Sequence, residues 1–166
     1  MESGCSGSYE TVGDERTGTD RGVHERELCE SLVGAAPGLE PAWREHLADN
    51  FAEPLPHVFM GDVARYFDQW AEAASLTQIN AFLDALERVA DSGGYGENLV
   101  TVSFVEYFVW GNERQNGLMD LCWDRMGPAT QRAVVGMRGY PGSLKWDAAE
   151  TERRTELERL ARKGHS

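Results

Sequence analysis

The sequence predicts an all-α protein, a compact multi-helix bundle around one central apolar helix at about residues 97–110. Three observations predict it. Between residues 24 and 137, apolar side chains recur mostly at three- and four-residue spacings, the period of a helix with one buried face. Residues that favour helix starts precede several of these segments. The period-two alternation that is typical of a half-buried strand is missing outside residues 99–102.

The chain divides into three parts by composition. Residues 1–22 mix Gly, Ser, Thr and charged residues with almost nothing to bury, so we expect a disordered N-terminal tail. Residues 23–146 form the helical domain, which is long enough for one core and ends in a loop over residues 138–146. Residues 147–166 are expected to form a charged helix, because acids and bases alternate at three- and four-residue spacings. The residues that this helix is expected to bury are only Ala149, Leu157, Leu160 and Ala161.

Two short helices are expected at the start of the domain. HERELCESLVG, which begins at His24, repeats apolar residues at helical spacing and stops at the breaker-rich GAAPG. PAWREHLADNF begins with Pro41, and proline suits the first position of a helix because its missing N–H is not needed there. Trp43, Leu47 and Phe51 lie four residues apart, so we expect them on one face of this second helix.

A helical hairpin is expected over residues 57–91. HVFMGDVARYFDQWAEAA is the clearest amphipathic segment of the chain, with an apolar stripe on one side and polar residues on the other. Ser75 and Gln78 match a capping box, so a new helix begins directly after them. Because almost no linker separates the two helices, we expect them to pack antiparallel. In the second helix, Asp84, Glu87 and Arg88 are expected to face water.

The segment over residues 97–110 is expected to be the central helix, because apolar side chains surround most of its axis. A rival interpretation places a strand at residues 99–102, followed by a helix capped by Ser103 and Glu106. A lone strand would leave its backbone groups without partners, so the single helix is preferred. Glycines at residues 93–96 predict a flexible joint before it. Two more helical patterns follow, at residues 118–126 and 129–137.

The chain is strongly acidic, with a formal charge of -12 from 28 acidic and 16 basic side chains. This charge disfavours nucleic acid and anionic membrane surfaces and favours a basic protein partner. No apolar run reaches the length of about 20 residues that a membrane helix needs. Cys5, Cys29 and Cys122 show no CxxC spacing, so we expect free thiols in a reducing cytoplasm.

Motifs for catalysis or cofactor binding are missing from the sequence. The four histidines lie in different segments, and neither HExxH nor ExxH occurs, so we expect no metal site. Ser103 and Cys122 are the nucleophiles that look buried, but neither lies in G-x-S-x-G or another nucleophile motif. We therefore expect no cofactor and no enzymatic activity.

Two groups of side chains are the candidate sites. The first is an acidic docking surface on helix faces, in which Glu106 either pairs with an arginine (Arg114, Arg125 or Arg132) or recognises a cation. Its members are Asp62, Asp68, Glu72 and Glu106. The second is a pocket between the central helix and the hairpin, where aromatic walls around one carboxylate would suit a cation or a ring. Its lining would be Tyr66, Trp70, Glu106, Tyr107 and Trp110.

Three stretches, LPHVFMGDVARYF, ENLVTVSFVEYF and MGPAT, resemble an uncharacterised bacterial family of small all-helical cytoplasmic domains similar to the immunity proteins of toxin systems. The resemblance covers about residues 55–138 and implies no catalytic residue. We therefore expect a non-catalytic protein–protein interaction domain, such as an immunity or antitoxin-like inhibitor, whose acidic helix faces dock a basic partner such as a toxin. The alternative is an enzyme or small-ligand binder that uses the aromatic pocket.

Overall fold

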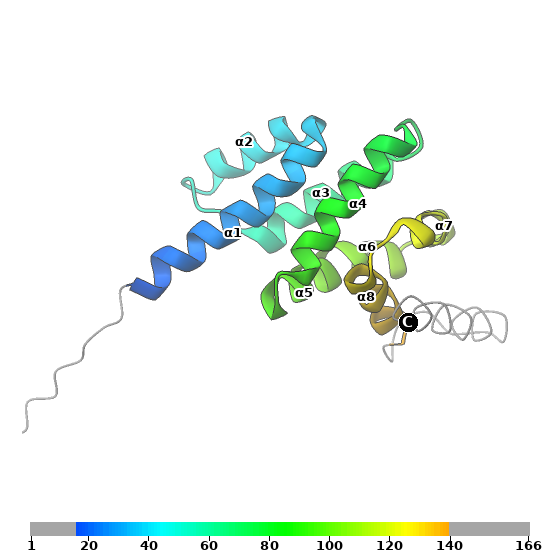
Figure 1. The fold of residues 1–166 in the computed structure, drawn as a ribbon. Helices are drawn as coiled ribbons and strands as arrows, with labels where there is room; N and C mark the ends of the chain where they lie inside the picture. Colours follow the sequence, from blue (N-terminus) through cyan, green and yellow to red (C-terminus); the bar gives the residue numbers. More distant parts are fainter. Residues whose placement is uncertain (1–15, 140–166) are drawn as a thin grey trace, which may run out of the picture.

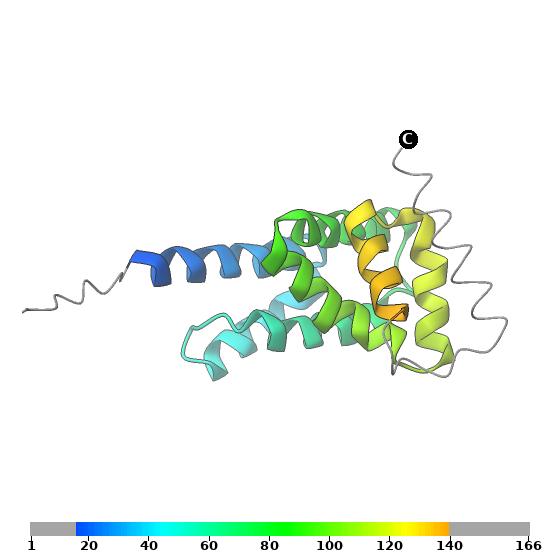
Figure 2. The same ribbon diagram turned by 90° about the horizontal axis from the view of Figure 1, so that it is seen from below.

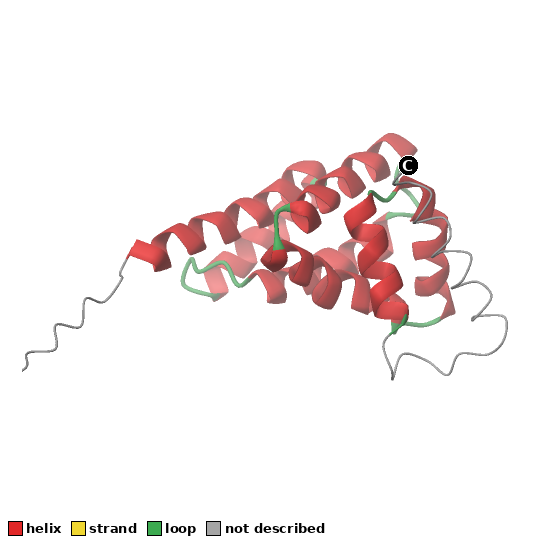
Figure 3. Cartoon of the chain, turned by 60° about the horizontal axis from the view of Figure 1, so that its bottom comes forward, coloured by secondary structure: helices red, strands yellow, loops and turns green. Residues whose placement is uncertain are grey.

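The computed structural model describes residues 16–139, and within this range every regular element is a helix (Figures 1 and 3). The all-α prediction is confirmed. The helices are α1 (Arg16–Ala35), α2 (Glu40–Asp49), α3 (Pro56–Trp70), α4 (Leu76–Asp91), α5 (Gly94–Leu99), α6 (Glu106–Val109), α7 (Glu113–Cys122) and α8 (Pro128–Arg138), with the 3₁₀ turns η1 (Pro37–Leu39) and η3 (Trp123–Arg125) and the π-helical segment η2 (Val100–Val105).

The predicted central helix exists as the unbroken succession of α5, η2 and α6, and no strand forms over residues 99–102. Phe104 and Phe108 of this helix are fully buried against Phe67 of α3 and Phe82 of α4. The rings of Phe67 and Phe82 stack with their centroids 4.7 Å apart. These four phenylalanines form the centre of the core.

The glycines before the central helix do not form the flexible joint that we expected. Gly93 has φ 116°, which glycine adopts without strain, and the helix begins directly after it at Gly94. A Cβ on Gly96 would lie 2.0 Å from the carbonyl oxygen of Val89, so only glycine fits where α5 passes the end of α4. The glycines therefore make a tight corner between two packed helices.

Helix α1 begins earlier than the sequence indicated. Residues 16–22, which the composition assigned to the tail, form its first turns, and α1 then packs against α3 and α4. Figure 2 shows α1 as a long helix extending away from the body of the domain. Residues 1–15 and 140–166 lie outside the described range, and so do most of the expected tail, the loop and the charged helix.

The expected hairpin is only partly present. The Ser75–Gln78 capping box forms, with Ser75 Oγ accepting from the Gln78 N–H at 3.3 Å and Gln78 Oε1 accepting from the Ser75 N–H at 2.9 Å. However, α3 and α4 meet at the turn, where Trp70 and Phe67 contact Phe82, and they do not pack along their lengths. The central helix and α1 contact both of them instead. The prediction of a closely packed antiparallel pair is wrong, because the central helix takes the space between them.

Among the described residues, no helix has both the length and the apolar character needed to cross a membrane.

Candidate functional site

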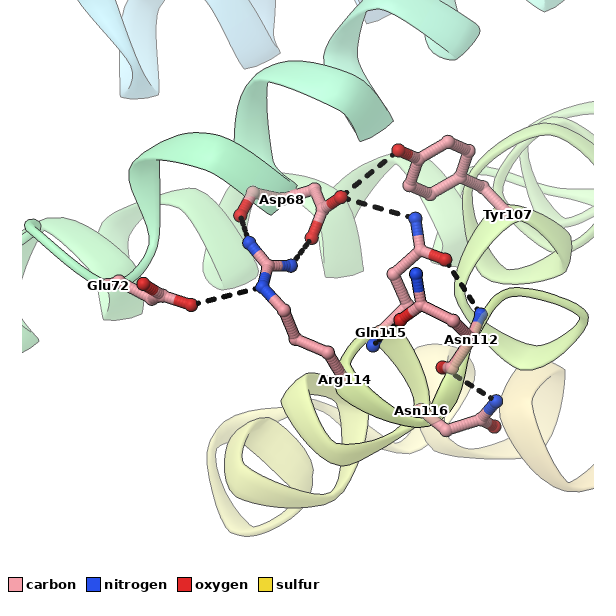
Figure 4. Close-up of polar contacts among 7 residues, drawn as sticks. All are labelled: Asp68, Glu72, Tyr107, Asn112, Arg114, Gln115 and Asn116. Carbon is pink, nitrogen blue, oxygen red and sulfur yellow. Dashed lines mark hydrogen bonds and ion pairs between the residues drawn. The ribbon is translucent and has the colours of Figure 1, made fainter.

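Asp68 is the centre of a polar network that joins α3 to α6 and α7 (Figure 4). Its Oδ1 pairs with the Arg114 guanidinium, and Arg114 also donates to the Asp68 backbone carbonyl at 2.9 Å. Its Oδ2 accepts from the Tyr107 hydroxyl at 3.1 Å and from the Gln115 amide at 3.2 Å. We expected Asp68 on a solvated docking face, and this prediction is wrong, because the carboxylate is buried and fully engaged.

The other predicted docking carboxylates have different environments. Glu72 is exposed, but it pairs with Arg114 Nε at 3.2 Å. Asp62 pairs with Arg65 within α3. Glu106 is half-buried and forms no ion pair with Arg114, Arg125, Arg132 or any other described residue. The four carboxylates therefore do not form one free acidic surface.

The predicted aromatic pocket is filled by its own side chains. Tyr66 stacks on Trp70 with the ring centroids 5.4 Å apart, and the Tyr66 hydroxyl lies over Gly38, where even a methyl group would clash. Tyr107 packs edge-on against Phe108, and burial raises its pKa together with the hydrogen bond to Asp68. Trp110 lies at the surface. These residues, with Glu106, do not line either of the two grooves described next.

The described surface has open grooves, and two of them are considered in turn. The first, named the α1 groove, has a volume of about 520 Å³ and lies between the start of α1, the chain before α3, and α5; it is lined by Gly22, Glu25, Glu53, Pro54, Leu55, Pro56, His57, Val58 and Tyr95. The second, named the α7 groove, has a volume of about 460 Å³ and is lined by Glu72, Arg114, Gly117, Leu118, Asp120 and Leu121. The sequence analysis did not anticipate either one.

The loop beside the α1 groove presents Phe51 to solvent. We expected Phe51 on one face with Trp43 and Leu47, but α2 ends at Asp49, so Phe51 lies beyond the helix and is 98% exposed. Phe51 has φ 53° and Ala52 has φ 64°, and these are the non-glycine residues with positive φ in the described chain. Each such conformation costs about 1–2 kcal/mol for an L-residue. A bulky apolar side chain is therefore held in water by a strained backbone.

Hydrogen bonds hold this strained loop in place. The Ala52 N–H donates to the Leu47 carbonyl at 2.7 Å, and Arg26 of α1 donates to the Ala52 carbonyl at 2.7 Å. The buried His46 ring accepts from the Leu55 N–H at 3.2 Å and packs against the rings of Trp43 and Phe59. The loop is thus clamped at both ends, and Phe51 projects from a fixed support.

Apart from Arg26, which binds the Ala52 carbonyl and also pairs with Glu30, the charges around Phe51 are negative. Asp49 and Glu53, two residues before and after it, are exposed and form no ion pair with any described residue. Glu45 of α2 is exposed as well, and Glu25 lines the groove alongside Glu53. Glu53 links the exposed ring to the groove, because it belongs to both. The result is one apolar anchor within an acidic border.

A serine–histidine pair lies next to the α1 groove. Ser103 Oγ, in the π-helical segment η2, is 2.7 Å from Nδ1 of His57, which lines the groove. The His57 ring also packs edge-on against Tyr95, with the centroids 5.8 Å apart. π-Helical segments occur frequently at functional sites. The sequence drew attention to Ser103 but gave no sign of its partner, which is 46 residues away in the chain.

Two kinds of side chain that often carry chemistry, cysteine thiols and potential metal ligands, are considered next for the described residues. Burial raises the pKa of Cys29 to about 12 and also raises the pKa of Cys122, so both thiols stay protonated. Within residues 16–139, no three His, Cys, Asp or Glu side chains come together as metal ligands.

The fold and its grooves define a small all-helical domain with an acidic, partly apolar surface. This chain belongs to the family described as Domain of unknown function (DUF7674), whose family model matches residues 29–139. The match confirms the expected membership of an uncharacterised family. No curated protein and no solved structure matches the chain.

Proposed function

We propose that this protein is a non-catalytic interaction domain that docks a basic protein partner against Phe51 and the α1 groove. The supporting observation is Phe51 itself, because a strained, hydrogen-bonded loop holds a fully exposed aromatic ring that adds nothing to the core. Aromatic residues are enriched at protein interfaces, and a fixed anchor loses little conformational entropy on binding. The exposed ring is best explained as an anchor for a partner.

Charge defines the class of partner. Asp49, Glu53 and Glu25 surround the anchor and the groove, and the whole chain carries a formal charge of -12. Complementary charge speeds encounter and rejects acidic competitors. The partner surface is therefore basic, with an apolar pocket that accepts Phe51. An immunity or antitoxin-like inhibitor of a basic toxin, acting by occlusion in the bacterial cytoplasm, is the form of this function that the sequence resemblance favours.

A capture experiment with charge-reversed variants tests the proposal. The full-length domain is immobilised and exposed to a lysate of its own cell at about 0.05 M and about 0.5 M salt. The test variant carries Asp49→Lys and Glu53→Lys. The control carries Asp84→Lys and Asp91→Lys, the same change in net charge at exposed positions of α4. We expect capture of a basic protein at low salt, reduced roughly tenfold by the test variant and little by the control.

Equal losses in both variants would mean that only net charge matters, and would overturn the assignment to this surface. A partner retained by the test variant would overturn it as well. Substitution of Phe51 by Ala separates the anchor from the charges, because it should reduce capture at high salt too, where electrostatic attraction is screened.

A small-ligand or enzymatic function is the second proposal, and the Ser103–His57 contact of 2.7 Å is the observation that favours it. A histidine within hydrogen-bond reach can activate a serine as a nucleophile. In the described chain, no carboxylate hydrogen-bonds to the other nitrogen of His57, so this proposal stands second. The test is labelling by a fluorophosphonate. Labelling of Ser103 that is lost in Ser103→Ala and His57→Ala would support it, and an unlabelled Ser103 would exclude it.

A further inference from the structure

The α1 groove has one sign of charge on its walls. The charged side chains among its lining residues are Glu25 of α1 and Glu53 of the chain before α3, and both are acidic. Arg26, the next residue of α1, binds the Ala52 carbonyl at 2.7 Å and pairs with Glu30 at 3.7 Å. The groove, with a volume of about 520 Å³, is therefore an acidic site that is large enough to take a side chain of a partner.

The wall that runs from Glu53 to Pro56 accepts hydrogen bonds but has no backbone donor to offer. Pro54 and Pro56 carry no N–H. The Glu53 N–H donates to a carbonyl of the preceding loop at 2.9 Å, and the Leu55 N–H donates to the His46 ring at 3.2 Å. The polar groups that remain are carbonyl oxygens and the exposed Glu53 carboxylate. An occupant that needs donors, such as a carboxylate or a phosphate, would not be satisfied at this wall.

A guanidinium group is the chemical complement of such a wall. It carries five N–H donors and no acceptor, and it keeps its positive charge in proteins. It also stacks on aromatic rings, and the rings of His57 and Tyr95, whose centroids lie 5.8 Å apart, both line the groove. A lysine ammonium matches the charge, but it is a compact and strongly hydrated ion that does not stack as a plane. Arginine therefore suits the groove better than lysine.

We propose that the α1 groove receives an arginine side chain of the partner, with its guanidinium on the Glu53 carboxylate and the adjoining carbonyls, and its plane against Tyr95. This inference rests on the proposed function, which places a basic partner at this surface, and it adds the side chain that the groove recognises. Aromatic residues and arginine are the side chains that most often dominate the energy of an interface. Each molecule thus contributes one anchor, Phe51 from this domain and an arginine from the partner.

Gly22 allows the groove to be filled without any change of charge. A Cβ at Gly22 would meet no atom within 4 Å, so a larger side chain can start there and occupy part of the groove. Leucine is a better helix former than glycine, so Gly22→Leu should leave α1 at least as stable. Gly34 of the same helix has equally open surroundings but does not line the groove. Gly34→Leu is therefore a matched control.

An NMR titration with small probes tests the proposal on the full-length, isotope-labelled protein. The first probe is N-acetyl-arginine amide. The second is N-acetyl-citrulline amide, which has the same shape but a neutral urea group with an acceptor oxygen. We expect the arginine probe to shift the amide signals of Glu53, Leu55 and Tyr95, with a dissociation constant on the order of 1–10 mM. The citrulline probe should bind at least about fivefold more weakly, and N-acetyl-lysine amide should also bind more weakly than the arginine probe.

The variants assign the binding to the groove. Gly22→Leu and Glu53→Gln should each weaken binding of the arginine probe by roughly fivefold or more. Gly34→Leu and Asp84→Asn, which removes an exposed charge from α4, should bind the probe as the wild-type protein does. Equal losses in the controls, binding of citrulline or lysine as tight as that of arginine, or no shifts at about 50 mM arginine probe would each overturn the proposal.

The result is separable from that of the capture experiment. If the arginine probe does not bind while Phe51→Ala still reduces capture, the assignment of the groove is overturned and the interaction function stands. If the probe binds as expected but no basic protein is captured, the arginine site is supported and the proposed function is overturned.

Discussion

Phe51 shows how a single residue can oppose the stability of the fold. Its ring is exposed and does not pack in the core, and its backbone has a positive φ, which favours glycine or asparagine. Exposed strain of this kind persists only where the surroundings enforce it, as the hydrogen bonds from Arg26 and to Leu47 do here.

Substitution of Phe51 by Asn should therefore stabilise the protein. Asn tolerates positive φ, and the lost ring has no partner in the fold, so we expect the free energy of unfolding to rise by about 0.5–1 kcal/mol. Urea denaturation measures the change. Phe51→Ala is the control, because alanine lacks the side-chain amide whose local hydrogen bonds let asparagine adopt positive φ, so it should leave stability nearly unchanged. A destabilised Asn variant would show that the ring supports the fold.

Asp68 and Asp62 allow a second comparison between neighbouring residues of α3. Asp68→Asn removes a buried charge that Arg114 and Tyr107 depend on, so we expect a loss of about 2 kcal/mol. Asp62→Asn disturbs an exposed pair with Arg65, and we expect a change within about 0.5 kcal/mol. Chemical denaturation of both variants measures the difference. Similar losses would mean that the network around Asp68 contributes no more than a surface ion pair.

The buried thiol of Cys29 predicts a pH dependence. Its pKa is about 12 in the folded protein and near 9 when exposed, so only the unfolded chain releases the proton between these values. The stability that this group contributes is fully present below pH 9 and is lost as the pH rises toward 12. Tyr66 and Tyr107, whose pKa values are raised by burial, act in the same direction.

We expect the free energy of unfolding to fall steadily above pH 9, and to fall less steeply in Cys29→Ala. Urea titrations at a series of pH values measure the slope. An identical slope in the variant would show that the thiol is accessible in the native state.

At the scale of elements, the start of α8 depends on a side chain from α4. Glu87 accepts from the Ala129 N–H at 2.8 Å, from the Thr130 N–H at 2.9 Å and from the Thr130 hydroxyl at 2.8 Å. We expected Glu87 in water, and this prediction is wrong, because its carboxylate caps a helix 42 residues further along. A Cβ on Gly127 would lie 2.2 Å from the Glu87 carboxyl carbon, which explains the glycine at that position.

Glu87→Ala should cost about 2 kcal/mol, because it leaves the first N–H groups of α8 without acceptors. Asp84→Ala, on the same helix but exposed, should change stability by less than about 0.5 kcal/mol. Thermal unfolding of the two variants gives the comparison. If both lose equally, the cap does not stabilise α8.

The elements could be predicted from the sequence where the signal is local. The box at Ser75 and Gln78 was evident, and Asn112 with Gln115 forms a similar one that the same spacing could have revealed. Long-range features could not be found this way. The Glu87 cap, the Ser103–His57 contact and the π-helical geometry of η2 depend on how distant segments meet, and helical periodicity carries no information on that.

At the scale of the whole molecule, the sequence gives the total charge, but it did not predict which carboxylates are free at the surface. The chain has a large excess of acidic residues. However, Asp62, Asp68 and Glu72 form ion pairs with arginines of the same chain, and Glu87 caps α8. The carboxylates without a described partner lie elsewhere, for instance at Asp49 and Glu53. A pattern on one helix could not indicate which arginine another helix would supply.

The excess charge predicts a salt response. Many carboxylates repel one another in the folded chain, so screening should stabilise it, and we expect the melting temperature to rise between about 0.01 M and about 0.5 M NaCl. The Asp84→Lys, Asp91→Lys variant, which is less acidic, should show a smaller rise. Differential scanning calorimetry measures both. A melting temperature that falls with salt would mean that attractive ion pairs outweigh the repulsion.

One feature of the α1 groove bears on how such domains diverge. Gly22 and Glu25, which form one of its walls, precede the stretch matched by the family model, whereas the loop with Phe51 lies inside it. A chain that shares only the matched stretch with this one has to build the Gly22 and Glu25 side of such a groove from a different extension. Changes near the beginning of α1 can thus alter one wall of this groove while the core of the domain stays the same.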